Sequence, residues 1–187
     1  MTIDPAVLSV EEYRALRATI RERGNLRFVS VLVTFSVWAA ASICVWAQLT
    51  VPAAVLVPLF VLAVGFEVVY SLHVGTERVG RYLQVYYESV TELPPAWEHL
   101  AMAIGADKTA APLKLDGLFS AMFAAGAILN LVPVAFLTAI DSGGLPVELI
   151  AYACFHAFFI VRIVQARRIA RGQRARDLAF FEKQRHS

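Results

Sequence analysis

A single carboxylate inside an apolar stretch is the residue of this chain best placed to do chemistry. Glu67 stands in the run from Val51 to Leu72, which contains no other charged residue. A charged side chain near the middle of a bilayer costs on the order of 2.5 to 3.5 kcal/mol, so it requires a partner or a water-filled cavity. We therefore consider three roles for Glu67: an ion pair between helices, a proton or ion site, and a contact with another protein.

A cation of matching depth occurs in the last apolar run. At 1.5 Å per residue, Glu67 lies about 22 Å along a helix from Pro52, and Arg162 lies about 24 Å from Pro146. We therefore predict a Glu67–Arg162 pair that joins two spans, with Glu67 as a buried charge. The alternative for Arg162 is that its long side chain reaches out to the inner membrane surface.

Three further polar residues lie within apolar runs: Asn130, Tyr152 and His156. A histidine near the middle of a membrane can relay protons or bind a cofactor. More often, a single histidine or asparagine in such a position forms a hydrogen bond between helices. We prefer the second interpretation for His156 and Asn130.

The residues that could bind metal do not form a recognised pattern. His73 and Glu77 share a helix face, but a two-metal site in a helical bundle requires two Glu-x-x-His motifs and two further glutamates. The chain also lacks a G-x-S-x-G turn, a glycine-rich phosphate loop and an H-E-x-x-H motif. We predict no metal, no cofactor and no catalytic residue, although His73 and His156 do not exclude a haem. A membrane enzyme or metal-binding protein built on Tyr70, His73 and Glu77 is our third hypothesis.

The elements that position these residues follow from the hydropathy. Of the 187 residues, 58% are hydrophobic and 17% are charged, whereas soluble domains are about half apolar and a quarter charged. The apolar residues gather in four runs that are each long enough to cross a bilayer. We predict an all-α integral membrane protein, a single membrane domain over residues 1–187, with four transmembrane helices in two hairpins: 26–48, 51–72, 117–140 and 146–166.

Several helices are expected to extend beyond the membrane. Ser9 and Glu12 form a capping box that starts an amphipathic helix over 9–24, and Gly24-Asn25 marks an expected bend. The second span has no proline to stop it between Pro58 and Pro94, so we predict one helix from 51 to 91. A short helix over 95–105 is expected to lie at the membrane surface, and the fourth span continues as a basic helix.

The extension of the second span carries a polar stripe at steps of three and four residues: Tyr70, Glu77, Arg81, Gln84 and Glu88. The simpler interpretation is a solvated polar face opposite a packed apolar face. The alternative is a continuous polar track that leads up to Glu67.

The basic residues set the orientation. All 17 Lys and Arg residues precede the first span or lie at its start, lie between the second and third, or lie late in or after the fourth. The positive-inside rule therefore places both termini in the cytoplasm, in a plasma membrane that we take to be a bacterial inner membrane. The arginines after the fourth span are also expected to bind anionic lipid headgroups or an acidic partner: Arg167, Arg168, Arg171 and Arg174. Topology accounts for these arginines, so we predict no nucleic-acid partner.

Three functions follow, in order of preference. The first is a non-enzymatic structural or accessory subunit of a membrane complex, or a homo-oligomer, because the outer loops are minimal and catalytic motifs are absent. The second is a small ion or proton channel or transporter that uses Glu67 and His156. The third is the enzyme or metal-binding protein described above.

Overall fold

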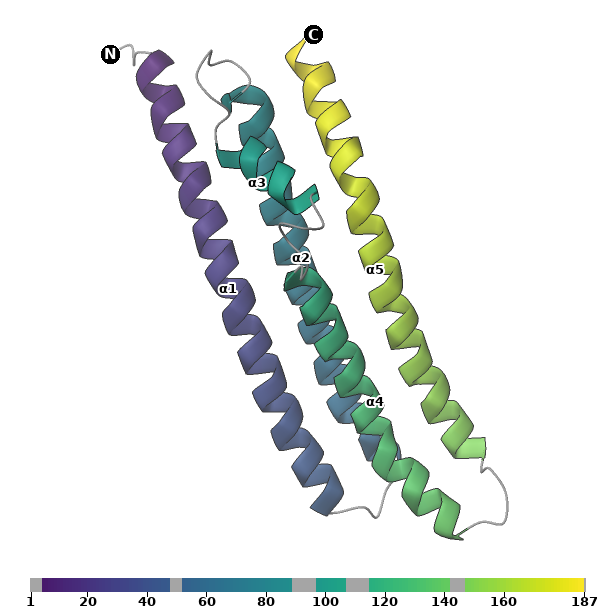
Figure 1. Ribbon diagram of the computed structural model, residues 1–187. Helices are drawn as coiled ribbons and strands as arrows, with labels where there is room; N and C mark the ends of the chain where they lie inside the picture. Colours follow the sequence, from purple (N-terminus) through teal and green to yellow (C-terminus); the bar gives the residue numbers. More distant parts are fainter. Residues whose placement is uncertain (1–4, 48–51, 89–96, 107–114, 142–146, 187) are drawn as a thin grey trace. The chain divides into compact units, whose positions relative to one another are not determined.

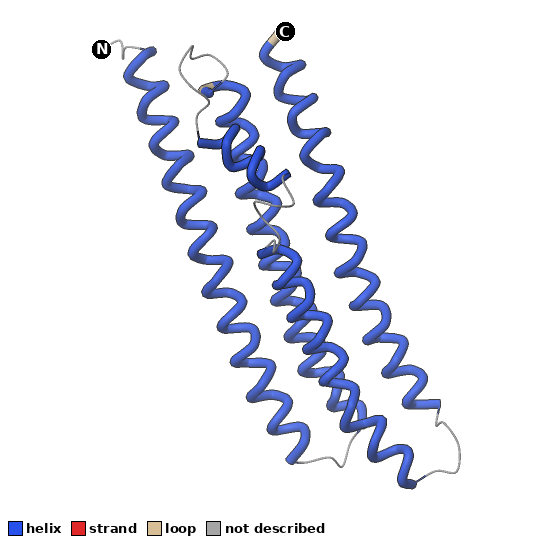
Figure 2. Tube along the Cα trace, in the orientation of Figure 1, coloured by secondary structure: helices blue, strands red, loops and turns tan. Residues whose placement is uncertain are grey.

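The computed structural model describes residues 5–47, 52–88, 97–106, 115–141 and 147–186, and these residues contain helices and turns but no strand (Figures 1 and 2). The elements in chain order are α1 (Pro5–Ala47), the short 3₁₀ helix η1 (Pro52–Val55), α2 (Leu56–Tyr86), α3 (Trp97–Ala106), α4 (Leu115–Asp141) and α5 (Val147–Arg185). The prediction of an all-helical protein is confirmed for these residues.

Within the described ranges, three helices are long and apolar enough to cross a membrane: Ser9–Ala47, Ala53–Tyr86 and Leu149–Arg185. In α4, the stretch Gly117–Val132 is apolar but shorter. The chain is therefore compatible with a protein that crosses a membrane more than once.

The N-terminal helix is longer than the sequence indicated. We expected separate helices over 9–24 and 26–48, whereas α1 continues without a break through Gly24 and Asn25. Gly24 does not adopt the left-handed conformation that ends many helices. A glycine inside a helix costs roughly 0.5–1 kcal/mol relative to alanine, which lowers stability without ending the helix.

The helix expected over 51–91 also differs from the prediction at both ends. Its first turn is the 3₁₀ helix η1, and its α-helical part ends at Tyr86, with a turn at Tyr87. Pro58 has no backbone N–H to donate, and 3₁₀ turns are common at helix N-termini. Residues 89–91, and residues 95–96 of the expected surface helix, lie outside the described ranges.

The helices contribute to two compact units, and the expectation of a single membrane domain stays a prediction. Unit 1 consists of residues 1–28, 71–114 and 168–187, and unit 2 consists of residues 29–70 and 115–167. Helices α1, α2 and α5 each contribute one segment to each unit.

Unit 2 has an apolar surface. Leu32 of α1, Phe60 of α2 and Phe158 of α5 are 69%, 70% and 73% exposed. Its core is aromatic, with the ring of Phe66 centred 5.5 Å from that of Phe123 and 5.9 Å from that of Phe159. Polar residues also lie inside it: Thr34, Ser120, Asn130 and His156 are all buried. Apolar side chains outside and paired polar groups inside are the distribution expected for helices surrounded by lipid.

Unit 1 has the opposite character. Arg81, Glu88 and Asp177 are buried, with exposed fractions of 3%, 8% and 7%. A charged residue is rarely buried unless it is paired. Ion pairs between helix segments therefore form much of the interior of unit 1.

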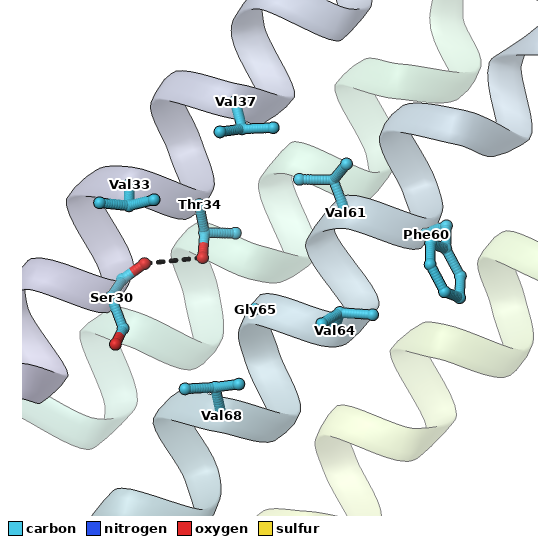
Figure 3. Close-up of a pocket in the computed structure, with 9 residues that line it drawn as sticks. All are labelled: Ser30, Val33, Thr34, Val37, Phe60, Val61, Val64, Gly65 and Val68. Atoms are coloured by element: carbon cyan, nitrogen blue, oxygen red, sulfur yellow. Dashed lines mark hydrogen bonds between the residues drawn. The ribbon is translucent and has the colours of Figure 1, made fainter.

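In unit 2, α1 and α2 approach closely at Gly65. A Cβ atom at this position would lie 2.2 Å from Cγ2 of Thr34, far inside van der Waals contact. Thr34 itself donates a hydrogen bond to the carbonyl oxygen of Ser30 at 2.6 Å. Figure 3 shows these residues beside a mainly apolar groove between the two helices. Small residues commonly allow this close packing between membrane helices.

The close approach predicts that Gly65→Ala destabilises the protein, because the added methyl group forces α1 away from α2. Overpacking of a well-packed site costs typically 1–3 kcal/mol. Gly24→Ala is the matched control, since nothing lies within 4 Å of a Cβ atom at Gly24. That change should leave stability unchanged or raise it by roughly 0.5–1 kcal/mol. Unfolding in detergent micelles, followed by circular dichroism, measures the stability of both variants. Equal effects of the two substitutions would contradict the close approach of α1 and α2 at Gly65.

Candidate functional site

The structure brings Glu67 of α2 and Arg162 of α5 together within unit 2. Nη2 of Arg162 donates a hydrogen bond to Oε2 of Glu67 at 2.8 Å. The guanidinium group also lies over the ring of Tyr70, with Cζ 5.4 Å from the ring centroid. Tyr70 follows Glu67 by three residues on α2, so both side chains can reach the same cation. These three residues form what we call the outer pair site.

The outer pair site is not buried, contrary to our expectation for Glu67. The side chain of Glu67 is 47% exposed and that of Arg162 is 31% exposed. Val64 and Val68, which flank Glu67 on α2, are also exposed. Depth counting along a helix fixes how far a residue lies from the membrane surface, but not the direction in which its side chain points. The pair lies along the outside of the contact between α2 and α5.

A second polar cluster lies inside unit 2 and joins η1, α4 and α5. Nδ2 of Asn130 donates a hydrogen bond to the carbonyl oxygen of Val55 at 2.9 Å and lies 3.1 Å from Nε2 of His156. Nδ1 of His156 lies 2.7 Å from the carbonyl oxygen of Tyr152. Tyr152 thus contributes its backbone, and not its ring, to this cluster.

The geometry of this inner cluster assigns the protonation of His156. A carbonyl oxygen only accepts, so Nδ1 of His156 carries the hydrogen atom that points to Tyr152. The amide nitrogen of Asn130 only donates, so Nε2 accepts and is unprotonated. Both ring nitrogens of this neutral histidine are therefore engaged in contacts between or within helices. In the described part of the chain, Oδ1 of Asn130 has no hydrogen-bond partner.

Glu88 is the centre of a charged cluster in unit 1. Its Oε1 accepts hydrogen bonds from Nη2 of Arg17 at 3.2 Å and from the backbone N–H of Glu98 at 3.1 Å. Its Oε2 accepts from the backbone N–H of His99 at 3.2 Å and lies 2.9 Å from Nδ1 of the same residue. Glu98 in turn accepts a hydrogen bond from Arg17. A carboxylate from the end of α2 thus caps the N-terminus of α3 and binds α1.

Arg81 is the centre of the second charged cluster in unit 1. Its Nη1 donates to Oδ2 of Asp177 at 2.7 Å and its Nη2 donates to Oε2 of Glu77 at 3.0 Å. Asp177 also accepts a hydrogen bond from Nε2 of Gln173 at 2.8 Å. Arg78 lies at 3.6 Å from the same carboxylate. This network connects α2 to α5.

The two clusters correct our interpretation of the polar stripe as a solvated face. Glu77 is exposed, but Gln84 is half-buried, and Arg81 and Glu88 are buried. The two buried charges of the stripe, Arg81 and Glu88, instead contact α1, α3 and α5 within unit 1. Sequence reasoning missed Asp177, although it is the single acidic residue between Arg162 and Phe181, a segment that contains five arginines. A single carboxylate in a basic segment was the feature of the sequence that could have indicated an ion pair at Asp177.

The pKa of Asp177 reflects the network around it. Burial raises the pKa, but the hydrogen bonds from Gln173 and Arg81 and the charges of Arg78 and Arg81 outweigh it, so the pKa falls below the usual value. The carboxylate is therefore ionised wherever unit 1 is folded near neutral pH.

A tyrosine cluster in unit 1 surrounds Glu12. The hydroxyl group of Tyr82 donates to Oε1 of Glu12 at 3.1 Å, and the rings of Tyr13 and Tyr87 have centroids 5.5 Å apart. Burial, together with the hydrogen bond and the charge of Glu12, raises the pKa of Tyr87 to about 12. The same causes, in the same order, raise the pKa of Tyr82.

The arginines predicted to bind lipid or a partner are accessible. Arg167, Arg168 and Arg171 are exposed and Arg174 is partly exposed. Within the ranges that the structure describes, none of these four side chains forms a hydrogen bond or ion pair.

The residues considered for metal binding make other contacts. Nδ1 of His73 lies 3.1 Å from Nη1 of Arg27, and Glu77 pairs with Arg81. Among the described residues, no three His, Cys, Asp or Glu side chains are placed to hold a metal ion.

Comparison of the chain with protein-family models, with curated proteins and with solved structures gives no match.

The low pKa of Asp177 predicts how stability depends on pH. A carboxyl group whose pKa is lower in the folded state stabilises the protein above its unfolded pKa of about 3.9. This contribution is lost as the pH falls through the folded pKa. Asp177→Asn should lower the free energy of unfolding at neutral pH by roughly 3–5 kcal/mol, as expected when a buried pair is broken, and should flatten its fall in acid. Denaturant titrations at several pH values measure both effects.

The control for this prediction is Glu11→Gln. Glu11 also pairs with an arginine, Arg14, but its side chain is 62% exposed. Exposed pairs contribute about 0–1 kcal/mol, so this change should have little effect. An Asp177→Asn variant as stable as the Glu11→Gln variant at neutral pH would contradict the importance of the network.

The raised tyrosine pKa values predict a late step in alkaline titration. The neutral phenol of Tyr87 stabilises the folded state fully below its unfolded pKa of about 10, and this stabilisation is lost as the pH rises towards 12. Tyr87→Phe should remove the highest step in the ultraviolet absorbance of tyrosinate. Glu12→Gln should move the late steps to lower pH, whereas Glu11→Gln should not. Identical titration curves for all these proteins would exclude a special role of Glu12.

Proposed function

We propose that the protein is a non-enzymatic integral membrane protein with four spans in two hairpins and both termini in the cytoplasm of a bacterial plasma membrane. The three long apolar helices and the apolar stretch of α4 support four spans. The positions of the 17 basic residues support the orientation.

We propose further that it functions by binding another membrane-spanning helix, as a structural or accessory subunit or as a homo-oligomer. The outer pair site carries this proposal. Glu67 and Arg162 are partly exposed on a surface where Val64, Phe158 and Val161 are exposed as well. Charged groups at such a surface are costly when lipid surrounds them, so a partner helix that contributes a polar group would stabilise the arrangement.

The outer pair site is also suited to self-association. It presents one carboxylate and one guanidinium group side by side, at a distance of 2.8 Å. In a two-fold symmetric contact, the same surface of both copies meets, so the carboxylate of each copy can face the guanidinium group of the other. If the partner is a different subunit, a single hydrogen-bonding group on that subunit is enough to contact Glu67 or Arg162.

A channel that uses Glu67 and His156 has less support from the contacts. The side chain of Glu67 is directed to the outside of unit 2. Both ring nitrogens of His156 are occupied, and its side chain is buried. The two residues thus belong to separate clusters of unit 2.

Exchange of the two charges tests the proposed binding function. Native mass spectrometry of the wild-type protein in mild detergent should show a second copy or another chain. Glu67→Arg gives two cations at the site and Arg162→Glu gives two anions, so each variant alone should associate about tenfold less, equivalent to about 1.4 kcal/mol. Co-expression of the two variants should restore the assembly if the partner is a second copy.

The exposed Arg14–Glu11 pair provides the matched control. Its charges can be reversed by Glu11→Arg and Arg14→Glu, and these changes should leave the assembly intact. If the assembly contains a different chain, both variants at the outer pair site should lose it and their mixture should not restore it. A wild-type protein that is monomeric and carries no other chain would overturn the proposal.

A further inference from the structure

Helix α3 exposes three large apolar side chains on one face. Trp97 is 64% exposed, Leu100 is 46% exposed and Ile104 is 48% exposed. At 100° per residue, positions separated by three and seven residues lie within about 60° of the first position around a helix. The three side chains therefore form a continuous apolar strip on a helix of only ten residues.

The contacts that hold α3 are polar. The backbone N–H groups of Glu98 and His99 donate to Glu88, and the side chain of Glu98 accepts a hydrogen bond from Arg17. Glu88 has a side-chain exposure of only 3%, so this attachment is made inside unit 1. These polar contacts leave about half or more of each residue of the apolar strip exposed.

Such a helix has the character of a segment that lies at a membrane surface. Tryptophan is enriched where apolar lipid meets water, because its ring is amphipathic. A short amphipathic helix next to membrane spans can bury its apolar face at the boundary between headgroups and acyl chains.

The connectivity of the chain favours the bilayer as the surface, an inference that rests on the four spans proposed above. Residues 107–114 join α3 to α4, whose stretch Gly117–Val132 is apolar. A fully extended segment of this length spans at most about 30 Å, so α3 stays within reach of the membrane that α4 is proposed to cross. Phospholipid is therefore present at high local concentration wherever this strip is exposed.

We propose that α3 is a phospholipid-binding helix, which inserts Trp97, Leu100 and Ile104 between headgroups while Glu88 and Arg17 hold its polar side. This surface uses none of the residues of the outer pair site. Glu88 acts as a positioning residue, because its carboxylate fixes the start and the direction of α3 and does not itself contact lipid.

The fluorescence of Trp97 tests the proposal. Trp38→Phe and Trp46→Phe together leave Trp97 as the single tryptophan of the chain. The full-length variant is reconstituted into phosphatidylcholine–phosphatidylglycerol vesicles that contain lipids brominated either near the headgroup or near the end of the acyl chain. The shallow bromines should quench Trp97 at least twofold more than the deep bromines, and aqueous iodide should quench it little.

Two sets of variants report on the cause of the insertion. Leu100→Ser with Ile104→Ser should reduce quenching by the shallow bromines several-fold and increase quenching by iodide. Ala103→Ser is the control, because Ala103 is exposed but lies at the edge of the strip, about 120° around the helix from Trp97 and about 100° from Ile104. Glu88→Gln should make quenching by the shallow and the deep bromines more similar, since the charge that pairs with Arg17 is lost and α3 is held less firmly.

The outcomes separate the possible environments of the strip. Strong quenching by iodide alone would place Trp97 in water and overturn the proposal. Protection from both iodide and bromine would indicate coverage by protein and would overturn it as well. Should the single-tryptophan variant not fold, the difference between the wild-type protein and Trp97→Phe reports on the same residue.

Discussion

The need to pair every charge that leaves water is the constraint on which this structure depends. Helices α1, α2 and α5 each contribute to both units, and the charged side chains that α2 and α5 bury, Arg81 and Asp177, lie in their unit 1 segments. In unit 2, rings such as Phe66 and Phe123 fill the interior. In unit 1, Arg81 and Glu88 occupy comparable positions and are accommodated because carboxylates, guanidinium groups and helix N–H groups converge on them. The charges buried in unit 1 would have no partner among the aromatic rings of unit 2, so they could not be buried there.

The side chains of one polar cluster of unit 2 point into the unit, and those of the other lie at its surface. This difference determines which cluster could contact another protein. The contacts of Asn130 and His156 are directed inward and join α4, α5 and the start of α2, which is what polar residues contribute to the packing of membrane helices. Glu67 and Arg162 satisfy each other but remain partly exposed. An ion pair at the surface can form new hydrogen bonds with another protein. Buried polar groups, in contrast, can form hydrogen bonds only within their own chain. This difference is why we propose that the outer pair site, and not the inner cluster, binds a partner helix.

Properties that depend on helix geometry were predictable from the sequence, and properties that depend on neighbours were not. The rise per residue was enough to indicate that Glu67 and Arg162 lie at similar depth, and they are 2.8 Å apart. Hydropathy was enough to indicate an all-helical chain. Periodicity placed Arg81 and Glu88 on one stripe but gave no sign that other helices cover it. The contact of Gly65 with Thr34 depends on how closely two backbones approach, and no local pattern encodes that distance.

The pairing of Arg81 with Asp177 has a consequence for biosynthesis. The two residues are 96 positions apart, and chains are synthesised at roughly 5–20 residues per second, so about 5 to 20 s pass before the guanidinium group can meet its carboxylate. During that interval Arg81 has to remain hydrated, and the part of α2 that belongs to unit 1 cannot adopt its final packing. The closing step in the maturation of unit 1 is therefore the arrival of residues 168–187, whichever order the apolar helices follow into the membrane.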